Sequence, residues 1–239
     1  MIKCPVFLIF FFCIPIHLFS QNSELGIFAG ASGYTGELNH YFYRYELIHP
    51  AGGVIYRHNW TPHYSLKADA LYGRISGSDV APGADAFMRA RNLSFSSLLI
   101  EASGEIEFNF FPYFPGRDDL SGATPYIFSG FSMFYFNPVS GSGIALHSAP
   151  AEGKSYSIFQ PAIPMGMGFK LKAGTATIGM EAGARRTFTD YVDDVSTTYP
   201  SGMQRGNSQD TDWYFFTGLT LSLKISGENL KVDCKSFPK

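Results

Sequence analysis

Apolar and polar side chains alternate with a period of two along much of this chain, and this alternation restricts its fold more than any other feature. Between residues 98 and 110, one face is apolar and the other carries Glu101, Glu105 and Glu107. The same alternation recurs at residues 175–185 and 213–225. A period of two is typical of a β-strand with one apolar face, whereas a helix repeats every 3.6 residues. The sequence therefore predicts an all-β fold.

Eight segments of this kind follow one another along the chain. Most are longer than ordinary globular strands, which average about 5–6 residues. Their length suits a tilted strand that crosses a bilayer, which needs about 9–11 residues. Beyond residue 21, no stretch approaches the roughly 20 apolar residues of a membrane-spanning helix. The expected strands cover residues 24–35, 51–59, 63–75, 92–111, 124–137, 158–172, 174–188 and 211–226.

The connections between these strands differ in length in a regular way. Brief turns at 59–62 and 173–174, together with the link 112–123, alternate with long polar connections at 36–50, 76–91, 138–157 and 189–210. Short turns on one side and long loops on the other are typical of outer-membrane barrels. We therefore expect an eight-stranded antiparallel transmembrane outer-membrane β-barrel, with short periplasmic turns and long outer loops. The even number of strands predicts that both termini are periplasmic.

The first 20 residues have the layout of a secretory signal peptide. Lys3 precedes the short apolar run 6–14, and Ser20 offers a small residue before cleavage. The expected organisation is a removed signal peptide at 1–20, a barrel at 21–226 and a periplasmic C-terminal tail at 227–239. Cleavage would remove Cys4 and Cys13 and leave Cys234 as the only cysteine. A single cysteine in an exported protein is either a free thiol or half of an intermolecular bridge.

The polar faces of the strands predict the contents of the barrel. Eight strands leave an interior just wide enough for side chains, so a large solute channel is not expected. Buried charges need partners, so we expect an interior network of ion pairs, either as a packed polar plug or as a proton or ion path. The residues that the alternation places inside are Lys67, Asp69, Glu101, Glu105, Glu107, Glu181, Arg185 and Lys224.

Aromatic residues gather near the expected strand ends, which predicts girdles at the two membrane interfaces. The alternative is a soluble β-sandwich with an aromatic core. One group contains Phe110, Phe111, Tyr113, Phe114 and Tyr126, and the other contains Phe134, Tyr135, Phe136, Trp213, Tyr214 and Phe215.

Nothing in the sequence favours catalysis, a cofactor or nucleic-acid binding. The formal net charge of −2 gives no basic surface for nucleic acid. A Gly-x-Ser-x-Gly elbow and paired metal-ligand spacings are absent, and the histidines His40, His49, His58, His63 and His147 form no evident triad. Asp190, Asp193 and Asp194 are weak candidates for calcium ligands, and a solvated loop with turn-capping aspartates is the alternative.

Several sequence blocks, taken together and in order, resemble the PorG-type outer-membrane proteins of the type IX secretion system of Bacteroidetes. They span nearly all of the chain after the signal peptide. The blocks are RNLSF at 91–95, EFNFFPY at 107–113, TPYIFSGFSMFYFNP at 124–138, RTFTDYVDDVSTTY at 186–199 and QRGNSQDTDWYFFTG at 204–218.

The resemblance implies a small outer-membrane barrel that is a non-catalytic assembly component of a protein-export machine. Such a protein associates with a periplasmic ring of a PorK-type lipoprotein and a PorN-type partner, and in many relatives the machine also supports gliding motility. The segments 76–90 and 139–157 depart from the family pattern, so the resemblance implies nothing about a surface-exposed role.

The tail supplies candidate partner-binding residues. Because the periplasm is oxidising, Cys234 is a candidate for an intermolecular disulfide with a ring protein. Lys231 and Lys235 could steer an acidic partner electrostatically. Two other functions remain open from the sequence: a free-standing structural or adhesion barrel, and a lipid- or peptide-modifying barrel enzyme.

Overall fold

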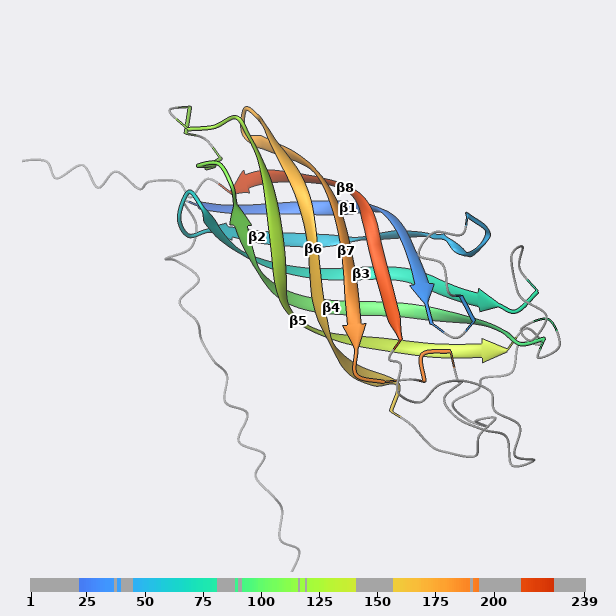
Figure 1. Cartoon of the computed structure of the whole chain (residues 1–239). Coiled ribbons are helices and arrows are strands. Elements are labelled where there is room, and N and C mark those ends of the chain that lie inside the picture. The colour runs from blue at the N-terminus through green and yellow to red at the C-terminus, as the bar shows by residue number, and fades with distance from the viewer. Residues whose placement is uncertain are drawn as a thin grey trace, which may run out of the picture.

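Eight antiparallel strands close into one barrel in the part of the chain that the computed structural model describes (Figure 1). The described residues are 22–36, 38–39, 45–80, 89, 92–115, 117–118, 120–140, 157–189, 191–193 and 212–225. Each strand pairs with its neighbours in sequence, and β1 closes the barrel against β8. The strands are β1 (Ser23–Thr35), β2 (His49–Asn59), β3 (Tyr64–Ser78), β4 (Ser94–Asn109), β5 (Ala123–Ser140), β6 (Phe159–Ala173), β7 (Ala176–Thr187) and β8 (Trp213–Ile225).

The predicted fold class and strand order are confirmed. Every expected strand is present, and each observed boundary lies within three residues of the expected one. A short 3-10 helix, η3 (Tyr45–Leu47), precedes β2. Within the described residues, no helix is both long and apolar enough to cross a membrane.

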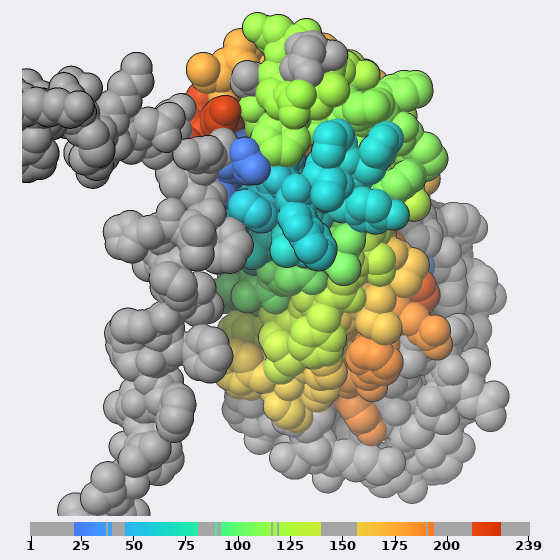
Figure 2. All heavy atoms as spheres, turned by 90° about the vertical axis from the view of Figure 1, so that its left-hand side faces the viewer, coloured from blue at the N-terminus to red at the C-terminus, as the bar shows by residue number. Residues whose placement is uncertain are grey.

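The barrel has a short-turn end and a long-connection end. The turn 60–63, the link 110–122 and the turn at Gly174 and Thr175 all lie at the short-turn end. Gly174 has a φ of 65°, a conformation that glycine adopts without strain. Ser23 pairs with Ile225, so the barrel begins and ends at this same end. Figure 2 views this end and shows the start of β1 (blue) beside the end of β8 (red).

The outer surface of the barrel is apolar along all eight strands. Large hydrophobic side chains that would be buried in a water-soluble protein are about half exposed on it. An apolar band around a closed barrel is typical of a surface in contact with lipid chains, because exposing such a band to water would be unfavourable. Examples from every strand are Leu25, Val54, Leu66, Ile106, Ile127, Met167, Met180 and Leu221.

The lumen is filled by two kinds of side chain. Toward the long connections it holds an aromatic and aliphatic core that includes Phe28, Ile75, Leu99 and Phe216. Toward the short turns it holds charged residues. The barrel therefore has a packed interior from end to end among the residues described, and the charged half is its most unusual chemical feature.

The predicted aromatic girdles are largely wrong. Tyr135 and Trp213 are half-buried, and Phe110 and Phe111 are exposed at the surface. Most of the other girdle residues are inward because even-numbered positions of β5 and β8 point into the lumen, where Phe134 and Tyr214 pack with ring centroids 5.0 Å apart. The predicted girdle residues found buried are Tyr113, Phe114, Tyr126, Phe134, Phe136, Tyr214 and Phe215.

Candidate functional site: the charged lumen and its lid

The inner faces of six strands contribute charged residues to the short-turn half of the lumen. All of them are buried, with at most 7% of their surface exposed. The strands alternate strictly, so these side chains face one another across the barrel instead of facing lipid. The basic residues are Arg57, Lys67, Lys170 and Arg185, and the acidic residues are Glu24, Asp69, Glu101, Glu105, Glu107 and Glu181.

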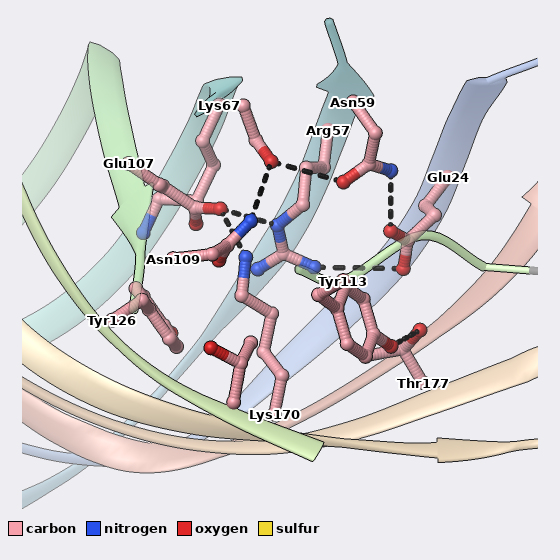
Figure 3. Close-up of polar contacts among 12 residues, drawn as sticks. Glu24, Arg57, Asn59, Lys67, Glu107, Asn109, Tyr113, Tyr126, Lys170 and Thr177 are labelled. Atoms are coloured by element: carbon pink, nitrogen blue, oxygen red, sulfur yellow. Dashed lines mark hydrogen bonds and ion pairs between the residues drawn. The ribbon is translucent and has the colours of Figure 1, made fainter. Parts of the chain in front are cut away.

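Glu107 of β4 is the centre of the cluster nearest the short turns (Figure 3). Its Oε2 accepts a hydrogen bond from Arg57 Nε at 2.9 Å and another from Lys170 Nζ at 2.6 Å. Arg57 also lies 3.6 Å from Glu24, measured from Nη1 to Oε2. Asn59 donates to the other carboxylate oxygen of Glu24 at 2.7 Å. The cluster thus joins β1, β2, β4 and β6 across the interior.

Lys67 of β3 is the centre of a second cluster. Its ammonium group lies 2.8 Å from Glu181, 2.7 Å from Glu105 and 3.5 Å from Asp69. The same group sits 4.5 Å from the centroid of the Phe128 ring, a cation–π distance. One cation therefore forms ion pairs with three carboxylates, one each on β3, β4 and β7.

A third cluster joins the charged half of the lumen to the aromatic half. Arg185 Nε donates to both carboxylate oxygens of Glu101, at 3.1 and 3.3 Å. The Tyr214 hydroxyl donates to the same carboxylate. The guanidinium carbon of Arg185 lies 4.9 Å from the centroid of the Phe216 ring. Glu101 and Arg185 therefore connect the ion pairs directly to the aromatic core.

Tyr113, in the link between β4 and β5, closes the charged lumen at the short-turn end. Its side chain is fully buried, and its hydroxyl lies 2.7 Å from Thr177 Oγ1 (Figure 3). Its backbone N–H donates to the carbonyl of Pro62 in the β2–β3 turn at 2.9 Å. Lys170 Nζ lies 5.7 Å from the centroid of the ring. Burial raises the pKa of Tyr113 to about 12, so the phenol stays neutral at physiological pH.

Further hydrogen bonds fix the link over the barrel mouth. Ser121 donates its N–H to the Pro112 carbonyl at 3.0 Å, which closes the link on itself. The ammonium group of Lys172 on β6 donates a hydrogen bond to the Arg117 carbonyl at 2.6 Å. We call the segment 110–122 the lid. Because the backbone of the lid is hydrogen-bonded both to itself and to β6, the lid has a defined position over the barrel mouth.

The opposite end of the lumen is closed by apolar side chains and one tyrosine. Tyr34 is fully buried, and its hydroxyl lies 2.6 Å from Asp193 Oδ2 and 2.8 Å from Asp212 Oδ1. Leu38 and Val192 are buried beside it in the same core. Together with the lid, these groups fill both mouths within the described residues.

Seven of the eight charged residues that the sequence places inside lie in the lumen, where they are ion-paired or hydrogen-bonded. Lys224, which we also expected inside, is half-buried. Sequence reasoning missed Glu24, Arg57, Lys170 and Tyr113. The first three occupy inward positions of the alternation and could have been found by extending it to β1, β2 and β6. Tyr113 lies outside any strand, and the alternation says nothing about it.

The other candidate residues are dispersed. His49 Nε2 lies 2.7 Å from Ser76 Oγ, and His63 Nδ1 lies 2.9 Å from the Asn109 carbonyl. Among the described residues, no three potential ligands gather around a possible metal position. The calcium candidate Asp193 contacts Tyr34, as described above. His40, His147, Asp190, Asp194, Lys231, Cys234 and Lys235 lie outside the described residues, as do the signal peptide and the tail.

Comparison with solved structures finds small barrels of low sequence identity. Ail of Yersinia pestis, solved in complex with the heparin analogue sucrose octasulfate, has 10% identity and a TM-score of 0.45, covering 85% of this chain and 98% of Ail. Neisserial surface protein A has 11% identity and a TM-score of 0.46, covering 84% and 96%. The N-terminal β-barrel domain of Pseudomonas aeruginosa OprF has 12% identity and a TM-score of 0.42, covering 85% and 98%. Likeness at this level carries no information about binding or activity.

Comparison of the sequence itself gives a family. No curated protein sequence matches the chain. A family model described as a domain of unknown function, DUF6089, matches residues 3–232, which include every strand of the barrel. This protein therefore belongs to the DUF6089 family.

Proposed function

We propose that this protein is a non-catalytic outer-membrane component of the type IX secretion machinery, where it anchors a periplasmic ring of PorK- and PorN-type proteins. The observation that carries the proposal is the sealed lumen, filled by ion pairs and closed by Tyr113. A filled eight-stranded barrel offers no route for an exported protein. What it offers is a rigid platform fixed in the bilayer.

The apolar outer surface supports the membrane placement. Side chains such as Ile27 of β1, Ile106 of β4 and Met167 of β6 are more than half exposed on different walls of the barrel. Exposing a continuous apolar band to water would be unfavourable, whereas lipid chains accept it. The placement in the outer membrane is also what the predicted signal peptide and barrel class imply.

The short-turn end supports the anchoring role. The turn 60–63 and the lid are bonded to each other, so this end presents an ordered face. Affinity for a soluble partner must come from segments outside the bilayer, and the chain leaves the barrel here at Ile225. We propose that this end faces the periplasm and that the lid and the residues from 227 to 239 contact the ring.

The resemblance to PorG-type proteins supports the choice of machine. Its second block, 107–113, contains Glu107, which pairs with Arg57 and Lys170, and ends at Tyr113 in the lid. The block therefore coincides with the residues that hold the lumen closed and shape the face proposed for docking.

Removal of the tail tests the anchoring role. We expect a chain that ends at residue 226 to insert normally and to recover less of the PorK- and PorN-type proteins in pull-downs from mild detergent. A chain with the outer segment 141–156 replaced by a glycine–serine linker of equal length is the control and should recover them fully. Insertion is checked by heat-modifiable gel migration. Unchanged recovery without the tail would refute docking through this segment.

The same pull-down tests the proposed disulfide. We expect Cys234 to form a bridge with a ring protein, giving a slow band on non-reducing gels that disappears with reductant and with Cys234→Ser. Neutralising Lys231 and Lys235 to glutamine should lower recovery mainly at low ionic strength, because salt screens exposed charges. If the wild-type protein gives no slow band, Cys234 is not a bridging residue.

A further inference from the structure

An apolar groove runs along the outer surface where β8, β1 and β2 meet. It is a shallow, open groove with a volume of about 330 Å³, lined by Gly26 and five aliphatic side chains. The strand register assembles it, since Leu25 lies opposite Leu223, and Ile27 lies opposite both Leu221 and Val54. Gly26 contributes only backbone to the groove, because a side chain at this position would point to the lumen against Ser222. The five aliphatic residues, each 47–58% exposed, are Leu25, Ile27, Val54, Leu221 and Leu223.

Polar side chains follow this groove at the short-turn end of the same wall. Tyr56 lies opposite Leu25, one step beyond Val54 on the outer face of β2, and His58 follows it. Ser23 Oγ lies 2.9 Å from the Tyr56 hydroxyl and 3.1 Å from His58 Nδ1. Ser23 is almost fully buried, so it holds the phenol and the imidazole in place. The outer face of β2 thus changes from an apolar side chain at Val54 to hydrogen-bonding side chains at the next two outward positions, Tyr56 and His58.

We propose that this groove and its polar end bind one phospholipid molecule, with an acyl chain along the groove and the ester or phosphate oxygens against Tyr56 and His58. The order of groups along the wall matches a phospholipid, which is apolar toward the bilayer centre and rich in acceptor oxygens at the interface. Phenol O–H and imidazole N–H groups are donors for such oxygens. The proposal rests on the membrane placement given above and adds a specific lipid to it.

The neighbouring wall, formed by β3 and β4, differs near its short-turn end. There, Tyr64 and Phe108 pack with ring centroids 5.3 Å apart, and Phe108 and Phe110 with centroids 5.4 Å apart. Aromatic side chains that pack on one another fill the surface instead of leaving a channel between aliphatic side chains. The groove on β8, β1 and β2, lined by separate aliphatic side chains, instead leaves room for an acyl chain.

Native mass spectrometry of the full-length protein, extracted from outer membranes in mild detergent, tests the proposal. We expect wild-type molecules to retain one phospholipid. Val54→Phe fills the groove, and we expect it to lower the retained fraction about tenfold, the effect of a 1.4 kcal/mol loss in binding. Ile106→Phe makes a matched change on β4, where Ile106 is also exposed, and should leave retention unchanged. Tyr56→Phe removes one donor without added bulk and should lower retention too.

Heat-modifiable gel migration and membrane fractionation establish that each variant is folded and inserted. An inserted wild-type barrel that retains no phospholipid, or equal retention by Val54→Phe, Tyr56→Phe and Ile106→Phe, overturns the lipid site and leaves the membrane placement intact. A wild-type barrel that does not fractionate with the outer membrane overturns the proposed function itself.

Discussion

Lys170 on β6 donates to Glu107 on β4 at 2.6 Å, although β5 separates the two strands in the sheet. The contact therefore crosses the lumen instead of following the sheet. Arg57 shares the same carboxylate oxygen from a third strand. Glu107 thus contacts two buried cations, of which Arg57 also lies near Glu24. Loss of Glu107 would leave two cations with one carboxylate, so this residue is a sensitive point of the network.

Replacing Glu107 should destabilise the barrel strongly. Glu107→Gln keeps the shape of the side chain but leaves Arg57 and Lys170 with an uncompensated buried charge, which costs about 3–5 kcal/mol. The measurement is urea-induced unfolding of the protein in lipid vesicles. Asp118→Ala is the control, because Asp118 is fully exposed beside Lys172 and should be replaceable without measurable change. Equal stability of Glu107→Gln and wild type would show that the cluster is not held by this carboxylate.

Replacing a whole ion-paired group should be far less harmful than removing one member. The triple change Glu101→Leu, Arg185→Met and Tyr214→Phe removes every charged or donor group of the third cluster, and apolar replacements of similar size are often neutral or stabilising. We expect its unfolding free energy to stay close to that of wild type. Glu101→Leu alone should lose about 3–5 kcal/mol. If the triple variant were the less stable of the two, the cluster would be a source of net stability.

The lid should control access to Lys170. Tyr113→Ala removes the buried ring beside Lys170, so we expect amine-reactive reagents to modify Lys170 in the folded barrel, as detected by peptide mass spectrometry. Tyr113→Phe keeps the ring and loses only the hydroxyl contact with Thr177, which costs about 1 kcal/mol. Lys170 should therefore stay unmodified in that variant. Labelling of Lys170 in the wild-type protein would contradict the closed lid.

Two glycines on neighbouring strands should differ sharply in their tolerance of alanine. A Cβ at Gly130 would lie 2.1 Å from the backbone oxygen of Gly104, so Gly130→Ala forces the β4 and β5 backbones apart. We expect a loss of about 1–3 kcal/mol, as for other overpacking changes. A Cβ at Gly104 meets nothing within 4 Å, and Gly104→Ala should cost no stability. Thermal unfolding of both variants in the same detergent measures the difference.

The sequence alone determined the strands, their order and the inward faces of those with clear alternation. Glu101, Glu105 and Glu107 are separated by even numbers of residues along one strand and so lie on the same face, which the alternation by itself assigns to the lumen. The ends of the strands followed from glycine, proline and polar connections. These are local properties, because the backbone geometry of a strand fixes the direction of each side chain relative to its neighbours.

The tertiary structure decided which charges meet and how the barrel is closed. Lys170 reaches Glu107 only because the curvature of the closed sheet turns the inner faces of β4 and β6, which are two strands apart, toward one narrow lumen. Phe134 and Tyr214 were expected at the surface, and their burial follows from the same closure. The place of Tyr113 depends on the path of a link that has no periodicity. Contacts between residues far apart in sequence depend on register and curvature, which no local pattern encodes.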